Sequence, residues 1–283
     1  MTKYYLTETR LKRIIKKSIK KILGEGIQIK HTPDKNYVTF DNSNNGIQDG
    51  PVVDTFKLPN SDTLITIYSM FKRVGNSRGD GNPALYALKK ENEWDFTNPT
   101  DFWVRFDELL RSFFNDHPVE VIVMLPSNNK LNGEIATHIL QISPNTLILN
   151  NVIGKLTTME VYKMASEKNS YFKKYWMNRG EDLNVVFYRL DYYLDIMDEK
   201  HNGYFSYHDI DDMMMRESLI NTMKTLPESY SIYKNEINNK NVLLLDDSIT
   251  LGQSVNSAVN ALESCYIPKS ISLLTMFSKL YKH

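Results

Sequence analysis

The sequence predicts an α/β protein in which a parallel sheet is flanked by helices. From Val119 onward, strand-like, loop-like and helix-like segments alternate, which is the rhythm of parallel strands joined by crossover helices. Four apolar residues run from Val242 to Leu245 without alternation, as is typical of a strand covered on both faces. The 283 residues, of which 41% are hydrophobic, suffice for one large domain or two modest ones.

The first predicted element is a basic amphipathic helix at residues 1–24. Residues 1–23 carry eight Lys/Arg and one Glu, whereas the formal net charge of the whole chain is zero. Apolar residues recur at helical spacing from Leu11 to Ile22, and Gly24 ends the pattern. This helix would dock on its own body or on a second copy in a homo-oligomer, or bind another partner such as nucleic acid. No aromatic residue lies from Leu6 to Leu23, within the periodic part of the helix, which counts against a membrane. The pattern resembles N-terminal segments of many proteins of crAss-like phages that infect Bacteroides.

The remaining elements follow from their residue patterns. β-branched and aromatic residues predict a strand at 63–71, and an apolar side from Phe102 to Phe113 predicts a helix. Further strands are expected at 119–125, 146–149, 241–246 and 270–277, and helices at 133–142, 157–168, 209–224 and 253–265, while 184–197 is ambiguous. The resulting organisation is the helix at 1–24, a loop-rich linker at 25–60 and a domain at 61–283. The core of this domain spans about 119–278, with added α+β elements before it.

Composition excludes several classes of protein. No apolar run reaches about 18 residues, the length that a membrane-spanning helix needs. Lysines interrupt the N-terminal segment throughout, unlike the apolar stretch of a signal peptide. Cys265 is the only cysteine, so an intrachain disulfide and a cysteine-rich zinc site are both excluded. We therefore expect a cytoplasmic protein.

The strand and turn at 241–254 suggest a function. Asp246 and Asp247 follow the apolar run, and because burying two like charges is costly, the strand must emerge there. That point is the carboxyl edge of the sheet, where open α/β sheets bind ligands. Thr250, Gly252 and Ser254 then lead into a helix, whose N–H groups and dipole favour a phosphate. Carboxylates beside a phosphate site suggest a ligand with vicinal hydroxyls, such as a ribose 5-phosphate, with magnesium.

Residues 242–254 resemble the signature of type I phosphoribosyltransferases, in which an apolar strand and Asp-Asp precede a Thr-x-Gly-x-Thr/Ser loop. In that family the acidic pair binds the ribose hydroxyls of phosphoribosyl pyrophosphate (PRPP), and the loop binds its 5-phosphate. The resemblance implies that Asp246 and Asp247 hold the ribose and the magnesium ion. It implies phosphate contacts from Thr250, Leu251, Gly252, Gln253 and Ser254, with Leu251 and Gln253 acting through their backbone. A second threonine is usual at the position of Leu251, so one hydroxyl contact is missing here.

A second loop stands where the resemblance requires one. The strand at 119–125 is followed by Ser127, Asn128 and Lys130 before the next helix. In type I phosphoribosyltransferases the loop after the first core strand binds pyrophosphate, and an ammonium group there would neutralise the departing group. The resemblance thus implies a pyrophosphate site at Ser127, Asn128 and Lys130, with Lys130 as a catalytic residue beside Asp246 and Asp247.

The resemblance covers about residues 119–278. It is strongest to the amidophosphoribosyltransferase-like and competence-protein-like branch of the family. The Arg-Gly-Phe-Asn stretch that is common in the competence relatives is absent from this sequence. It implies a magnesium-dependent enzyme that binds PRPP, or a related ribose 5-phosphate, and transfers phosphoribosyl to or from a nitrogenous base. The alternative is a non-catalytic regulatory or assembly protein that binds PRPP or a nucleotide in the same pocket. A third hypothesis is a DNA-associated function similar to that of competence proteins.

Residues 198–209 offer a competing interpretation. They match a calcium-binding EF-hand loop at Asp198 and Gly203, among other positions. However, Lys200 stands where an oxygen ligand is required, and Asp209 replaces the bidentate Glu. We therefore expect an Asn-Gly turn within an aromatic-rich lid over the active site, and a degenerate calcium loop is the alternative.

Overall fold

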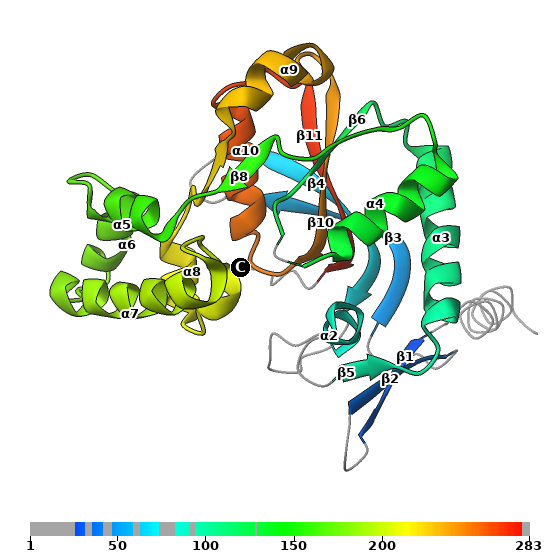
Figure 1. Ribbon diagram of the computed structural model, residues 1–283, viewed down its shortest axis with the longest axis horizontal. Coiled ribbons are helices and arrows are strands. Elements are labelled where there is room, and N and C mark those ends of the chain that lie inside the picture. Colours follow the sequence, from blue (N-terminus) through cyan, green and yellow to red (C-terminus); the bar gives the residue numbers. More distant parts are fainter. Residues whose placement is uncertain are drawn as a thin grey trace, which may run out of the picture.

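The computed structural model describes residues 26–31, 36–41, 47–58, 63–73, 83–90, 94–127 and 129–278. The fold is α/β, with a mixed six-stranded sheet at its centre and helices on both faces (Figure 1). The order across the sheet is β3 (Ile47–Lys57), β4 (Leu64–Arg73), β11 (Ser270–Ser278), β10 (Asn241–Ile249), β6 (Val121–Met124) and β7 (Leu147–Leu149). Neighbouring strands are parallel except β3, which runs antiparallel to β4, so the prediction of a parallel sheet is corrected to a mixed one.

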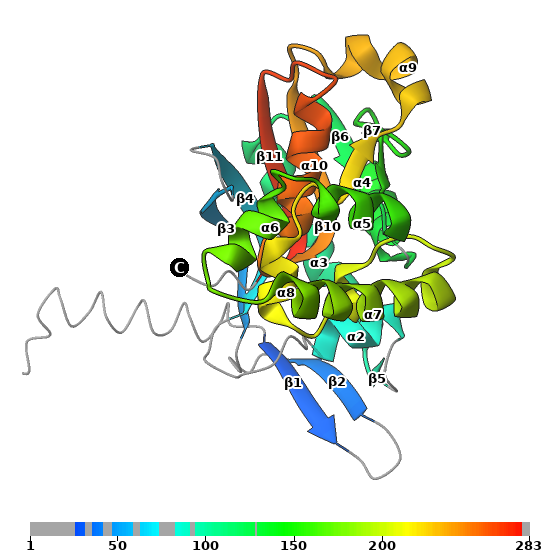
Figure 2. The same ribbon diagram turned by 90° about the vertical axis from the view of Figure 1, so that its left-hand side faces the viewer.

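The central strand β10 is covered on both faces, as its unalternating sequence predicts. Leu243 and Leu245 pack in a cluster with α3 (Pro99–Asp116) and α4 (Leu131–Ile142). Val242 and Leu244 point to the opposite face, where α9 (Pro227–Ile237) and α10 (Gln253–Glu263) complete a second cluster. Figure 2 shows α10 lying along one face of the sheet. The strand is therefore fixed between two apolar layers, which holds its carboxyl end in place.

The N-terminal part contains more regular structure than its composition suggests. A small sheet joins β1 (Gly26–His31), β2 (Asn36–Asp41) and β5 (Trp94–Phe96), next to α2 (Pro83–Lys89). Three strands thus lie within 25–60, where a linker is predicted. β1 pairs with β2, and β2 and β3 also pair with strands outside this range, β5 and β4 respectively. The basic helix predicted at 1–24 lies outside the described residues.

A helical insertion, defined here as residues 156–222, leaves the sheet domain between β8 (Ile153–Lys155) and β9 (Met223–Thr225), which pair antiparallel. It contains α5 (Thr158–Ser166), α6 (Tyr171–Met177), α7 (Leu183–His201), a 3-10 turn at Tyr207–Asp209 and α8 (Met213–Ser218). Trp176 and Leu190 are fully buried in a core that belongs to the insertion alone. The insertion projects to one side of the sheet (Figure 1).

Two sequence predictions change within the insertion. The ambiguous segment 184–197 is helical and belongs to α7. The helix predicted at 209–224 is wrong in extent, because α8 occupies only Met213–Ser218. Asn221 has a left-handed backbone with φ of 61°, which a continuing helix does not tolerate, and the chain then enters β9. Across the described ranges, no helix has the length and apolar character to cross a membrane.

Candidate functional site

The predicted phosphate loop connects β10 to α10. The strand continues to Ile249, beyond the predicted end at Asp246, and α10 begins at Gln253. Gly252 caps α10 in the left-handed conformation, with φ of 72°. A Cβ atom at this position would lie 2.2 Å from Cζ of Phe56 in β3, so both the backbone angle and the close approach require glycine. The first N–H groups of α10 therefore open toward the carboxyl edge of the sheet.

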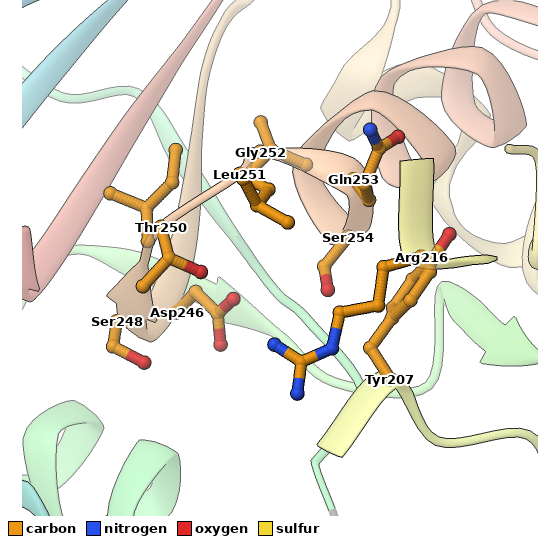
Figure 3. A pocket seen from close by; sticks show the side chains of 11 residues that line it. Tyr207, Arg216, Asp246, Ser248, Thr250, Leu251, Gly252, Gln253 and Ser254 are labelled. Atoms are coloured by element: carbon orange, nitrogen blue, oxygen red, sulfur yellow. The ribbon is translucent and has the colours of Figure 1, made fainter. Parts of the chain in front are cut away.

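A small pocket of about 70 Å³ lies against this loop. In Figure 3, Thr250, Ser254 and Asp246 point into the space in front of the loop, and Arg216 of α8 approaches from the other side. The side chain of Gln253 points away from this space. The lining consists of loop residues and two residues of the insertion: Tyr207, Arg216, Asp246, Ser248, Ile249, Thr250, Leu251, Gly252, Gln253, Ser254 and Val255.

The acidic pair is held by a network of donors. Asp247 is 5% exposed, and its Oδ2 lies 2.9 Å from Nζ of Lys89 in α2 and 3.2 Å from Nδ2 of Asn129. Oδ1 of Asp246 accepts hydrogen bonds from the Asp247 backbone N–H at 3.0 Å and from Nδ2 of Asn132 at 3.5 Å. Two neighbouring carboxylates are tolerated here because cationic and amide donors compensate part of their charge.

The two carboxylates differ in electrostatic environment. Burial is the main cause that raises the pKa of Asp246 to about 7, and the neighbouring carboxylate of Asp247 adds to the shift. The ammonium group of Lys89 acts in the opposite direction. A carboxyl group that is partly protonated near neutral pH can donate as well as accept a hydrogen bond, which suits contact with sugar hydroxyls.

Asp246→Asn is therefore expected to stabilise the ligand-free protein at alkaline pH. The folded-state pKa is raised above the ordinary value of 3.8, so the wild-type fold loses stability as pH rises from about 4 to about 7. The amide side chain that Asp246→Asn introduces does not ionise, so the variant does not undergo this loss. Its gain in free energy of unfolding should be near zero below pH 4 and about 1–3 kcal/mol at pH 8. Urea denaturation at several pH values measures this gain, and a gain independent of pH would contradict the raised pKa.

A larger cleft of about 690 Å³ extends from the acidic pair. Its walls come from α2 with Leu85 and Tyr86, from the loop after β6, and from the insertion. Lys155 of β8 also lines it, and burial lowers the pKa of its ammonium group, while the carboxylate of Asp246 partly opposes that shift. The cleft thus combines two carboxylates with cationic side chains, a composition that fits a ligand carrying both hydroxyl and phosphate groups.

The structure brings together most of the predicted site residues. Thr250, Leu251, Gly252, Gln253 and Ser254 share the small pocket with Asp246, while Ser127 and Asp247 line the adjoining cleft. Lys130 is exposed at the start of α4 and lines neither cavity. Asn128 is outside the described residues. The predicted pyrophosphate loop therefore reaches the cleft through Ser127 and its neighbour Asn129.

Sequence reasoning missed several residues of the site: Lys89, Asn129, Asn132, Lys155 and Arg216. Lys89, Lys155 and Arg216 lie in segments without a recognisable ligand-binding pattern. Asn129 lies within the predicted pyrophosphate loop and Asn132 two residues after Lys130, so the polar composition of that loop was the one signal that could have found them.

The segment interpreted as a lid or a calcium loop forms one wall of the cleft. Phe205, Ser206, Tyr207 and His208 are among its lining residues. Oδ1 of Asp198 accepts a hydrogen bond from the Thr158 hydroxyl at 2.5 Å. Asp209 contacts Nε2 of His201 at 2.6 Å and Nζ of Lys200 at 3.2 Å. The first and last residues of the predicted calcium loop, Asp198 and Asp209, are thus both engaged in contacts within the protein. Closure of this segment as a lid stays a prediction.

Metal-binding side chains are few at the site. Among the residues that the structure describes, no three His, Cys, Asp or Glu side chains are grouped to hold a metal ion. Magnesium is usually bound through one or two carboxylates together with substrate phosphates and water. Asp246 lines both cavities, and the chemistry of the carboxylate pair fits this requirement.

Comparison with known proteins adds no family assignment. No protein-family model matches the chain, and a search of curated proteins gives no significant match.

Proposed function

We propose that this protein binds a ribose 5-phosphate ligand such as PRPP together with magnesium, and transfers the phosphoribosyl group to or from a nitrogenous base. The observation that carries the proposal is the position of the Asp246–Asp247 pair directly beside a pocket formed by the N-terminus of α10. A phosphate in that pocket would place an attached ribose over the carboxylates. The mixed α/β sheet, with the acidic pair at the carboxyl end of β10, is consistent with a type I phosphoribosyltransferase fold.

The phosphate end of the ligand is assigned to the loop. The N–H groups at the start of α10 carry partial positive charge and have no partners within the helix. Hydroxyl groups of Thr250 and Ser254 point into the same space (Figure 3). Leu251 and Gln253 contribute backbone, since Leu251 has no polar side chain and that of Gln253 is turned away. The combination binds an anion through directed donors.

The pyrophosphate end is assigned to the cleft beyond the acidic pair. Ser127, Asn129, Lys89 and Lys155 line this region. Cationic groups there would stabilise charge that develops on a leaving pyrophosphate. Magnesium, held by Asp246 and Asp247 with the phosphate oxygens, would neutralise part of that charge. Asp246 and Asp247 would also orient the ribose hydroxyls and stabilise positive charge on the sugar in the transition state.

The exposed position of Lys130 favours a second candidate function. The residue predicted to neutralise the leaving group lies outside the cleft lining. A protein that binds PRPP or a nucleotide in the same pocket without turning it over would not need that group. Such a protein would act in regulation or assembly.

The proposal is tested by combining ligand binding with turnover. In the presence of magnesium, PRPP at about 100 times its Kd should raise the melting temperature of the full chain by about 5 °C or more. Pyrophosphate release is then measured across a panel of purine, pyrimidine and other nitrogenous bases. Release with one base supports the transferase, and binding without release on any base supports the non-catalytic function. Absence of a thermal shift and of binding heat would refute both.

A matched pair of lysine variants locates the pyrophosphate end. If Lys155 binds the leaving group, Lys155→Met should weaken binding of magnesium pyrophosphate about 10-fold or more, whereas Lys130→Met should leave it within about twofold. Isothermal titration calorimetry measures both. The reverse result would restore Lys130 to the role that the sequence implies.

A further inference from the structure

The helical insertion places a basic residue at the phosphate pocket. Arg216 lies in α8 and lines both the small pocket and the larger cleft. In Figure 3 its guanidinium group lies opposite the loop, near Ser254, and one of its outer nitrogens points toward Asp246. The pocket is therefore bounded by the N-terminus of α10 on one side and by a cation from a different part of the chain on the other.

The structure holds Arg216 in this position through its inner nitrogen. Nε donates a hydrogen bond to the backbone carbonyl of Ile210. Such a bond fixes the plane of the guanidinium group, whose fork of N–H donors matches the oxygens of a phosphate. An arginine oriented in this way loses less side-chain entropy when an anion arrives.

Hydrogen bonds also connect the segment that carries Arg216 to the phosphate-binding helix. The Tyr207 hydroxyl donates to the carbonyl of Leu219 at 2.6 Å and accepts from the Thr222 hydroxyl at 3.0 Å. The Thr222 backbone N–H donates to Oγ of Ser257 in α10 at 3.1 Å. The chain on either side of α8 is thus joined to the same helix whose N-terminus faces the pocket.

We infer that Arg216 is a phosphate-binding residue supplied by the insertion, and that it makes the site selective for sugars that carry a terminal phosphate monoester. This inference rests on the proposed function. The dianion would lie between the guanidinium group and the N-terminus of α10. Asp246 lines the same pocket, so its carboxylate repels an incoming phosphate, and the charge of Arg216 offsets that repulsion. The selected ligand class is a ribose 5-phosphate or a nucleoside 5′-monophosphate, and unphosphorylated sugars and nucleosides are rejected.

The inference is tested on the full chain by titration calorimetry with two probes, ribose 5-phosphate and magnesium pyrophosphate. Arg216→Gln should weaken ribose 5-phosphate binding about 10- to 100-fold, because it removes charge-assisted hydrogen bonds. Binding of magnesium pyrophosphate, assigned to the other end of the cleft, should change less than about twofold. Arg216→Lys keeps the charge without the fork and should fall between Arg216→Gln and the wild type. Arg179→Gln removes an exposed arginine of the insertion that lines neither cavity, and should match the wild type.

Each outcome of this experiment supports or overturns the inference. Unchanged ribose 5-phosphate binding in Arg216→Gln overturns it and leaves the proposed function standing. An equal loss of both probes in Arg216→Gln and Arg216→Lys also overturns it, because the effect would then be general damage to the cleft. If the wild type binds neither probe, the inference and the proposed function fail together.

Discussion

Gly252→Ala should destabilise the folded chain by about 2–4 kcal/mol, an estimate that adds the cost of a left-handed backbone to that of an overpacked contact. Alanine at φ of 72° is strained, and its Cβ atom would lie 2.2 Å from Cζ of Phe56. Either the ring or the loop must shift. A shift of the loop would misalign the N–H groups of α10, so binding of ribose 5-phosphate should also be lost. Urea denaturation and calorimetry measure the two effects.

Substitutions at two other glycines separate the cost of the left-handed backbone from the cost of the overpacked contact. Gly180 has φ of 73°, and a Cβ added there would meet no atom of the described residues within 4 Å, so Gly180→Ala should cost only about 1 kcal/mol. Gly133 lies in α4 with similarly open space around it, so Gly133→Ala should be neutral or stabilising by up to about 1 kcal/mol. The double variant Phe56→Ala, Gly252→Ala should show a favourable coupling of about 1–3 kcal/mol. If Gly252→Ala lowers the free energy of unfolding no more than Gly180→Ala does, the close approach of Phe56 does not by itself require glycine at position 252.

Asp247→Asn should lower the affinity for PRPP about 10- to 100-fold, because one or two charge-assisted hydrogen bonds to the ribose would be lost. The same change removes the carboxylate partner of Lys89, whose side chain is 15% exposed, and should cost about 1–3 kcal/mol of stability. Calorimetry with magnesium present measures the affinity, and urea denaturation measures the stability.

Asp54→Asn is the matched control for this variant. Asp54 forms an ion pair with Lys72 at 2.6 Å between β3 and β4, and neither residue lines the cleft. Its replacement should reduce stability without changing the affinity for PRPP. Equal affinities in Asp247→Asn and wild type would show that Asp247 does not bind the ligand.

The part of the site that could be predicted from the sequence consists of residues that are consecutive in the chain. The run 242–245 indicates a doubly covered strand, and the residues that follow it specify the turn, since strand, acidic pair and loop are consecutive. Gly252 could be identified as a backbone requirement, although its contact with Phe56 depends on the pairing of β3 with β4 and could not.

The basic residues around the candidate site could not be predicted, because each reaches it through tertiary structure. Lys89 ends a short helix, Lys155 ends a three-residue strand, and Arg216 lies in a helix whose predicted extent is wrong. Lys130 is the reverse case: it stands at a plausible position in the loop, yet it is exposed at the start of α4 and lines neither cavity, so its catalytic role stays a prediction. Adjacency in sequence indicates that a side chain is near a site and does not determine the direction in which it points.

The antiparallel pairing of β8 with β9 has a consequence for how this protein can change. Because the insertion departs and returns on adjacent strands, its two ends lie side by side, and a segment with adjoining ends can be exchanged while the path of the remaining chain is preserved. The insertion has its own core, and it brings Tyr207, His208 and Arg216 to the cleft. Under the proposed function, the residues that set ligand preference and the loop at 250–254 therefore lie in separate segments of the chain. Recombination could replace the first and keep the second intact.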